Sequence, residues 1–196
     1  MLFRSGTVGG AVVNNAGAFG SSVAESLISA RVLLNEVQET DLGLTDLGYR
    51  YRSSILKRQE LGSTVVLSAT FHLRRIPPEV ARERIRTFQE KRGATQPKLL
   101  SAGSVFANPP GDFSGRLLEE AGAKGMRRGD AEISTQHANF IINHGHASAR
   151  DVYDLIVAAQ TLVWKHNRIW IHPEIELFGR WSGEERSRLL LKETAS

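Results

Sequence analysis

The amino-acid sequence predicts a mixed α+β fold, and three observations support this class. Apolar and polar residues alternate from Val65 to Leu73, which is the pattern of a strand with one buried face. Ser148–Asp151 has the form of a capping box and precedes apolar residues at helical spacing up to Val163. Predicted strands and helices alternate without the regular order of a doubly wound sheet, which favours two subdomains.

The best candidate for a domain boundary is Ile76-Pro77-Pro78, where a strand gives way to a basic helix. That helix carries Ala81, Ile85 and Phe88 on one face, and Gly93 is expected to end it. An ordinary strand–helix connection within one domain would give the same pattern. The predicted division is a first domain at 1–76, a connecting helix at 77–98, a second domain at 99–180 and a charged tail at 181–196.

The remaining elements follow from shorter patterns. In the first domain we expect a strand at 26–34, a short turn or helix at 42–47, and an inner face on the 65–73 strand formed by Leu67, Ala69, Phe71 and Leu73. In the second we expect strands at 100–106, 131–134 and 139–143 and a helix at 114–121 closed by Gly122. A last strand, 169–178, should carry Ile169, Ile171, Ile175 and Leu177 on one face and Trp170, His172, Glu174 and Glu176 on the other.

Composition excludes several classes of protein. Hydrophobic residues make up 41% and charged residues 23%, as in globular proteins that dissolve in water. No stretch approaches the roughly 18 apolar residues of a membrane helix, and the N-terminus does not have the form of a signal peptide. The absence of cysteine excludes disulfides, thiolate metal sites and cysteine nucleophiles. We therefore expect a cytoplasmic protein that makes no contact with a membrane. We also expect a monomer, although composition does not decide the oligomeric state.

The chain is basic, with a formal net charge of +4, and the charge is concentrated between Arg74 and Lys98. This stretch has eight basic and three acidic residues, a net charge of +5. Nucleic acid or an anionic small molecule would both suit such a charge. Since no aromatic residues are interleaved to stack on bases, we expect a solvated helix face and no nucleic-acid partner.

Three features could carry chemistry. The glycine-rich stretch from Thr7 to Gly20 indicates either backbone N–H groups presented to a phosphate or tight packing. His144 and His146 lack a third ligand at useful spacing, so we expect no metal. Glu174 lies on a predicted strand, where its carboxyl group could be either buried and functional or turned outward to solvent.

Five ordered segments together resemble the UDP-N-acetylenolpyruvoylglucosamine reductases. Gly6–Val12 with Asn15–Gly20 is similar to that family's flavin-contacting signature, and Ser101–Pro109 to its A-G-S-x-F-x-N-P motif. The other three are Gly48-Tyr49-Arg50 with Ser53–Leu56, Gly122–Gly125 with Ser134–Asn143, and Pro173-Glu174-Ile175 ahead of Gly179.

The resemblance implies a fold, cofactors and a cofactor site. The fold would be the C-terminal part of a vanillyl-alcohol-oxidase-type FAD-binding domain (1–76), followed by a smaller α/β substrate-binding domain (99–180). FAD and NADPH would be the cofactors, and the N-terminal part of the flavin-binding lobe is expected to be missing from this sequence. The residues implied in cofactor binding are Thr7, Val8, Gly9, Gly10, Asn15, Gly17 and Gly20.

The resemblance also implies reduction of UDP-N-acetylglucosamine enolpyruvate to UDP-N-acetylmuramate, in peptidoglycan precursor synthesis. Arg50 would bind the substrate carboxylate, Ser104 would donate the proton, and Glu174 would assist in its protonated form. Tyr49, Asn108 and Gln136 are the implied substrate-binding residues. We see no tyrosine-bearing insertion between the Arg50 and Ser104 segments, which indicates the shorter subtype of the family.

One residue departs from the family, and other functions remain open. Glu176 stands where several relatives carry a basic residue useful for the nucleotide. The main alternative is a truncated, non-catalytic fragment of the family that binds a nucleotide-sugar or a partner chain. A basic RNA-binding module is a third reading, supported by the pI alone.

Overall fold

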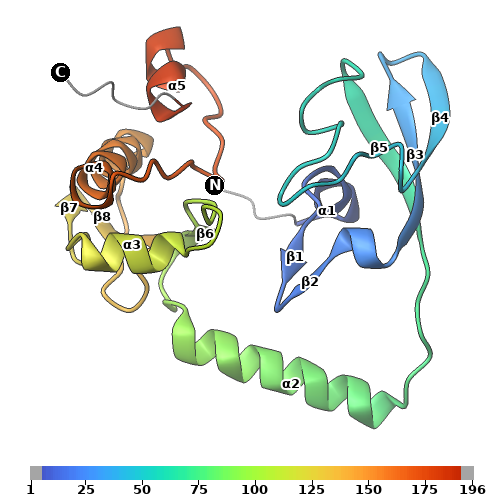
Figure 1. The fold of residues 1–196 in the computed structure, drawn as a ribbon, viewed down its shortest axis with the longest axis horizontal. Helices are drawn as coiled ribbons and strands as arrows, with labels where there is room; N and C mark the ends of the chain where they lie inside the picture. Colours follow the sequence, from blue (N-terminus) through green and yellow to red (C-terminus); the bar gives the residue numbers. More distant parts are fainter. Residues whose placement is uncertain (1–5, 191–196) are drawn as a thin grey trace. The chain divides into compact units, whose positions relative to one another are not determined.

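The computed structural model describes residues 6–190 and confirms the α+β class (Figure 1). The chain forms two compact units, with described residues 6–88 in the first and 89–190 in the second. The division falls inside helix α2 (Pro78–Thr95), and the domain borders expected from the sequence remain predictions. Gly93 does not end α2, which continues to Thr95. Among the described residues, no helix has both the length and the apolar character needed to span a bilayer.

The first unit is built on a three-stranded antiparallel sheet in the order β4-β3-β5. The central strand β3 (Leu27–Leu34) pairs with β4 (Gln38–Gly43) and with β5 (Thr64–Phe71). Ahead of it come helix α1 (Val8–Val13), the short strands β1 (Gly17–Ala18) and β2 (Ser21–Ser22), and a single 3-10 turn, η1 (Val23–Glu25). Its buried core consists of Val12, Leu27, Ala30, Val32, Leu47 and Leu56.

One expectation for this unit is wrong and another holds in part. The expected turn at 42–47 is present after Gly43, but its first two residues belong to strand β4, which was not predicted from the sequence. The inner face of β5 also differs, because Val32 pairs with Val66 while its neighbour Arg31 pairs with Ser68. This bulge at Leu67 shifts the alternation by one residue. Val66, Ala69 and Phe71 pack against the core, whereas Leu67 and Leu73 are exposed.

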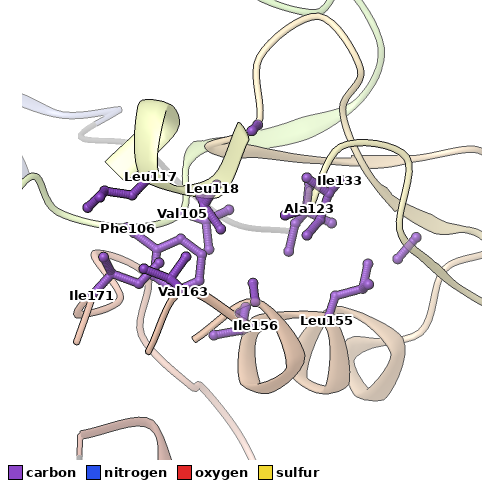
Figure 2. Close-up of a cluster of buried hydrophobic side chains, with 14 of the residues drawn as sticks. Val105, Phe106, Leu117, Leu118, Ala123, Ile133, Leu155, Ile156, Val163 and Ile171 are labelled. Carbon is purple, nitrogen blue, oxygen red and sulfur yellow. The ribbon is translucent and has the colours of Figure 1, made fainter. Parts of the chain in front are cut away.

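The second unit contains a four-stranded antiparallel sheet in the order β6-β9-β8-β7. Its strands are β6 (Ser101–Ser104), β7 (Arg127–Arg128), β8 (Ala131–Ile133) and β9 (Phe140–Asn143). Its other helices are α3 (Ser114–Glu120), α4 (Ala149–Asn167) and α5 (Gly183–Leu190). Figure 2 shows the core, in which side chains from α3 and α4 meet those that follow β6.

Helix α4 confirms the strongest prediction made from local pattern. The side chain of Ser148 accepts from the backbone N–H of Asp151, and the aspartate accepts in return from the N–H of Ser148. Leu155, Ile156 and Val163 are fully buried on its inner face, as their helical spacing predicts.

The predicted strand at 169–178 is wrong. This segment makes one isolated bridge, between Pro173 and Phe106, and has no regular secondary structure. Trp170 and Ile171, expected on opposite faces, are both buried. Apolar residues here follow the irregular surface of the core instead of a pleat. The expected charged tail also contains helix α5, whose Leu189 is buried against that core.

Candidate functional site

The glycine-rich stretch of the first unit folds into helix α1 instead of an open loop. Thr7 is its N-cap, and the threonine Oγ1 accepts from the backbone N–H of Gly10 at 3.0 Å. Val8 and Gly9 form the first turn, and the side chain of Val8 is 59% exposed. Four of the residues predicted to bind a cofactor are thus brought together at one end of a short helix.

Asn15 connects this helix to the segment that carries Arg50. Its side chain is buried, and its backbone has a positive φ of 43°. Its Oδ1 accepts from the N–H of Ala24 at 3.1 Å, and its Nδ2 donates to the carbonyl of Arg50 at 3.1 Å. Both ends of the amide are therefore used to hold two backbone segments in place.

Tyr49 and Ser54 bind the C-terminal end of α1. The phenol of Tyr49 donates to the carbonyl of Val12 at 2.9 Å, and the hydroxyl of Ser54 donates to that of Val13 at 2.6 Å. These bonds satisfy helix carbonyls that have no partner within the helix. Burial raises the pKa of Tyr49 to about 12, so its phenol remains a donor. The two sequence segments thus form one hydrogen-bonded body.

Arg50 lies in a tight turn on this body. Its backbone N–H donates to the carbonyl of Ser53 at 3.0 Å, and the return bond measures 3.2 Å. Its side chain is exposed, and, after the hydrogen bond from Arg58, its charge contributes to lowering the pKa of Glu60. The turn, Asn15 and Tyr49 therefore fix the backbone while the charged fork points to solvent.

Gly17 is required for packing, and replacing it gives a test of this body. A Cβ at Gly17 would overlap the backbone oxygen of Ser21 across the β1–β2 pair. We expect Gly17→Ala to destabilise the first unit by about 1–3 kcal/mol, because backbone must move. Amide hydrogen exchange along β3 measures this change.

Gly9→Ala is the matched control, since a Cβ there would meet Val66 at an ordinary 3.5 Å within a helix. Equal exchange in the two variants would contradict the requirement for glycine at position 17.

In the second unit, Ser104 is the last residue of β6, and Val105 after it bonds to two other segments of the chain. Val105 donates its N–H to the carbonyl of Asn139 at 2.9 Å, and its carbonyl accepts from the N–H of Glu174 at 2.7 Å. Gly103, just before Ser104, has a left-handed φ of 82°, which lets the strand bend at this point. The segments that carry Ser104 and Glu174 are thus joined by backbone pairing at Val105, and Oε1 of Glu174 is buried.

Asn139 is a residue of this site that sequence reasoning did not single out. It is buried, and its side chain pairs with Phe106 as a second strand would. Its Oδ1 accepts from the Phe106 N–H and its Nδ2 donates to the Phe106 carbonyl, both at 2.8 Å. The signal that could have found it is a polar residue within the otherwise apolar stretch 138–142.

The two predicted substrate-binding residues of this unit are exposed and also contact the protein. Oδ1 of Asn108 accepts from the N–H of Ser114 at the start of α3, at 3.1 Å. Nε2 of Gln136 donates to the carbonyl of Ala94 at 3.0 Å. Each side chain is therefore oriented by one bond while it remains accessible to solvent.

A cavity of about 550 Å³ lies behind the segment that carries Glu174. Val105 and Ile175, the neighbours of Ser104 and Glu174, line it, but Ser104 and Glu174 do not. Much of the remaining lining is apolar and includes Val152, Ile156 and Trp181. An apolar cavity of this kind does not suit a charged nucleotide-sugar.

His144 contacts the carboxyl group of Glu132. Its Nε2 lies 2.7 Å from Oε2 of buried Glu132, which also pairs with Arg127. Burial raises the pKa of Glu132, but bonds from His144 and Arg127 outweigh this and lower it overall. Within residues 6–190, no three side chains of the metal-binding types gather to hold an ion.

The predicted catalytic residues thus fall into two groups. Arg50 lies with Asn15 and Tyr49 in the first unit, while Ser104 lies with Glu174 in the second.

Comparisons with known proteins identify the relationship. The family model for the C-terminal domain of UDP-N-acetylenolpyruvoylglucosamine reductase matches residues 96–178. UDP-N-acetylenolpyruvoylglucosamine reductases of Chloroflexus aggregans and Chloroflexus aurantiacus are 45% and 47% identical to this chain, over 88% of its length. The crystal structure of the UDP-N-acetylenolpyruvylglucosamine reductase from Thermus caldophilus matches 88% of this chain, with a TM-score of 0.75 and 35% identity.

The match does not extend over the whole of these relatives. The chain spans about 59% of the length of the two Chloroflexus proteins and 60% of the Thermus chain. Within that span, the family's C-terminal domain is present, and similarity continues through most of the first unit as well. Residues 96–178 are therefore similar to the C-terminal domain of the UDP-N-acetylenolpyruvoylglucosamine reductases, and similarity to reductases of that name extends over 88% of the chain.

Proposed function

We propose that this chain takes part in the FAD- and NADPH-dependent reduction of UDP-N-acetylglucosamine enolpyruvate to UDP-N-acetylmuramate, a step of peptidoglycan precursor synthesis. The observation that carries the proposal is the pairing of the segments that hold Ser104 and Glu174, through the 2.7 Å bond from the Glu174 N–H to the Val105 carbonyl. This backbone bond joins the segments that carry the two residues, and a hydroxyl and a carboxyl group that both face the substrate would suit proton delivery. The similarity of the chain to reductases of this name supports the same reaction.

Arg50 is assigned to the substrate carboxylate. When hydride adds to the terminal vinyl carbon, negative charge builds on the neighbouring carbon and on its carboxylate. A guanidinium binds a carboxylate through two parallel hydrogen bonds. The exposed fork of Arg50, on a backbone fixed by Asn15, fits this task.

Ser104 is assigned to protonation of the enolate carbon. Its Oγ–H would give its proton to that carbon, completing reduction of the double bond. Serine is a weak acid, so position and polar neighbours must favour the transfer. Glu174, on the segment paired with Val105, would donate a hydrogen bond to the developing charge in its protonated form.

The first unit fits part of a flavin site. The exposed start of α1, at Thr7–Gly10, and the open position of Gly20 present an uncharged surface to a ring system. Asn15 and Gly17 would support this surface from within, since their contacts are with the protein itself. Bound FAD, once reduced by NADPH, would supply the hydride. Asn108 and Gln136, each oriented by one hydrogen bond to the protein, would contact the uridine-diphosphate part of the substrate. Tyr49 would be a third residue in contact with the substrate.

Purified protein tests the proposal directly. We expect flavin absorbance in the visible range, and NADPH oxidation that depends on the enolpyruvyl substrate and yields UDP-N-acetylmuramate by mass spectrometry. A colourless, folded protein that binds the UDP-sugar without turnover would instead support the non-catalytic alternative. Binding to neither flavin nor UDP-sugar would reject both the reductase and the non-catalytic alternative.

We further propose that the protein is a cytoplasmic monomer. Gel filtration checks the oligomeric state, and cell fractionation checks the location.

A further inference from the structure

The segment that carries Glu174 has little regular structure of its own. Strand-like pairing holds it from His172 to Glu174, where the Ala107 N–H donates to the His172 carbonyl at 2.9 Å and the Glu174 N–H donates to Val105. Beyond Glu174 the chain runs irregularly to Trp181. Contacts with other elements must therefore fix the second half of this segment.

Helix α5 supplies one such contact through Arg186. One guanidinium nitrogen, Nη1, donates to the carbonyl of Leu177 at 2.7 Å, and the other, Nη2, donates to the carbonyl of Gly179 at 2.9 Å. Gly179 has a left-handed φ of 100°, which glycine adopts without strain, and its carbonyl meets the same fork as that of Leu177. Two charge-assisted bonds from one rigid group define the position of this turn.

Helix α5 is itself anchored to the core. The buried amide of Gln160 on α4 donates from Nε2 to the carbonyl of Leu189 at 2.9 Å and to that of Ile171 at 3.0 Å. Tyr153 donates to the carbonyl of Glu185 at 3.1 Å, and its ring stacks on Trp181. The segment from Ile171 to Gly179 is thus held at its start by Gln160 and at its end by Arg186, with Glu174 between them.

We propose that Arg186 is a positioning residue for Glu174, and that α5 acts as a clamp on the segment bearing this carboxyl group. The proposal deepens the proposed function, on which its catalytic consequence rests. Helix α5 lies outside the part matched by the family model, residues 96–178. Because Arg186 would act through the backbone, its loss should impair protonation without removing a group that touches the substrate.

Hydrogen exchange of the Glu174 amide tests the positioning. We expect this amide to exchange about tenfold faster in Arg186→Ala, since two charge-assisted bonds are lost, and to show a smaller increase in Arg186→Lys. The lysine variant keeps the charge and the helix but lacks the fork, so it remains informative if the alanine variant unfolds α5. Arg188→Ala is the matched control on the same helix, and its Glu174 exchange should not change.

Turnover of the enolpyruvyl substrate then tests the consequence. The value of kcat should be unchanged in Arg188→Ala, lower in Arg186→Lys and lowest in Arg186→Ala, while KM and flavin reduction by NADPH stay unchanged in all three. Equal Glu174 exchange in the Arg186→Ala and Arg188→Ala proteins would overturn the proposal, as would faster exchange without loss of kcat. If the unmodified protein shows no turnover, the proposed function fails, and the exchange measurement alone decides whether Arg186 positions Glu174.

Discussion

Replacing Asn139 with alanine should lower the free energy of unfolding of the second unit by about 2–5 kcal/mol, because two buried backbone groups lose their partners. These groups are the N–H and carbonyl of Phe106, each 2.8 Å from the Asn139 amide and inaccessible to water. Urea unfolding followed by tryptophan fluorescence measures the change selectively. All three tryptophans, Trp164, Trp170 and Trp181, belong to the second unit.

Gln136→Ala serves as the control, because it removes one bond made by an exposed side chain. We expect a change of at most about 0.5 kcal/mol there. Asn139→Asp should be nearly as destabilising as alanine, since its second oxygen would face the Phe106 carbonyl. If Asn139→Ala unfolded within about 1 kcal/mol of the parent, Asn139 would not be the support assigned to it.

Replacing Ser104 with alanine should reduce formation of UDP-N-acetylmuramate by about 10²–10⁴-fold, the usual contribution of a positioned proton donor. Reduction of bound flavin by NADPH should continue at its normal rate, because the hydroxyl is assigned to the second half of the reaction only. Rapid mixing of enzyme with NADPH alone, followed by a product assay with substrate, separates the two halves.

Ser101→Ala is the matched control for this variant, being an exposed serine on the same strand. We expect it to keep full activity. Normal turnover by Ser104→Ala would remove Ser104 from the proposed mechanism. Loss of flavin reduction in that variant would indicate damage to cofactor binding instead of loss of the donor.

Local patterns predicted the elements that depend on local interactions. Helix α4 was predictable because its capping box and its buried stripe lie within one continuous stretch. Strand β3 and helix α3 followed for the same reason. The motifs quoted from the sequence also contain the residues that hold the candidate site together, including Asn15 and Asn139.

Failures occurred where distant residues decide the structure. Alternation along β5 breaks at Leu67 because of the register with β3, which the β5 sequence does not contain. The stretch 169–178 has strand-like periodicity but bonds mainly to the chain after β6, to Gln160 and to Arg186. Helix α5 was missed because one buried side chain, Leu189, gives too weak a pattern.

The bridge at Pro173 has a consequence for where proline is tolerated. The bonds on either side of it use the carbonyl of His172 and the N–H of Glu174, so the nitrogen of position 173 bonds to nothing there. Proline at position 173, which has no N–H group, therefore costs this pairing no hydrogen bond. At position 174, proline would remove the bond to Val105. Because backbone groups make this connection, it does not depend on the side chain at position 173, whereas that of Val105 is fixed separately by its burial in the core.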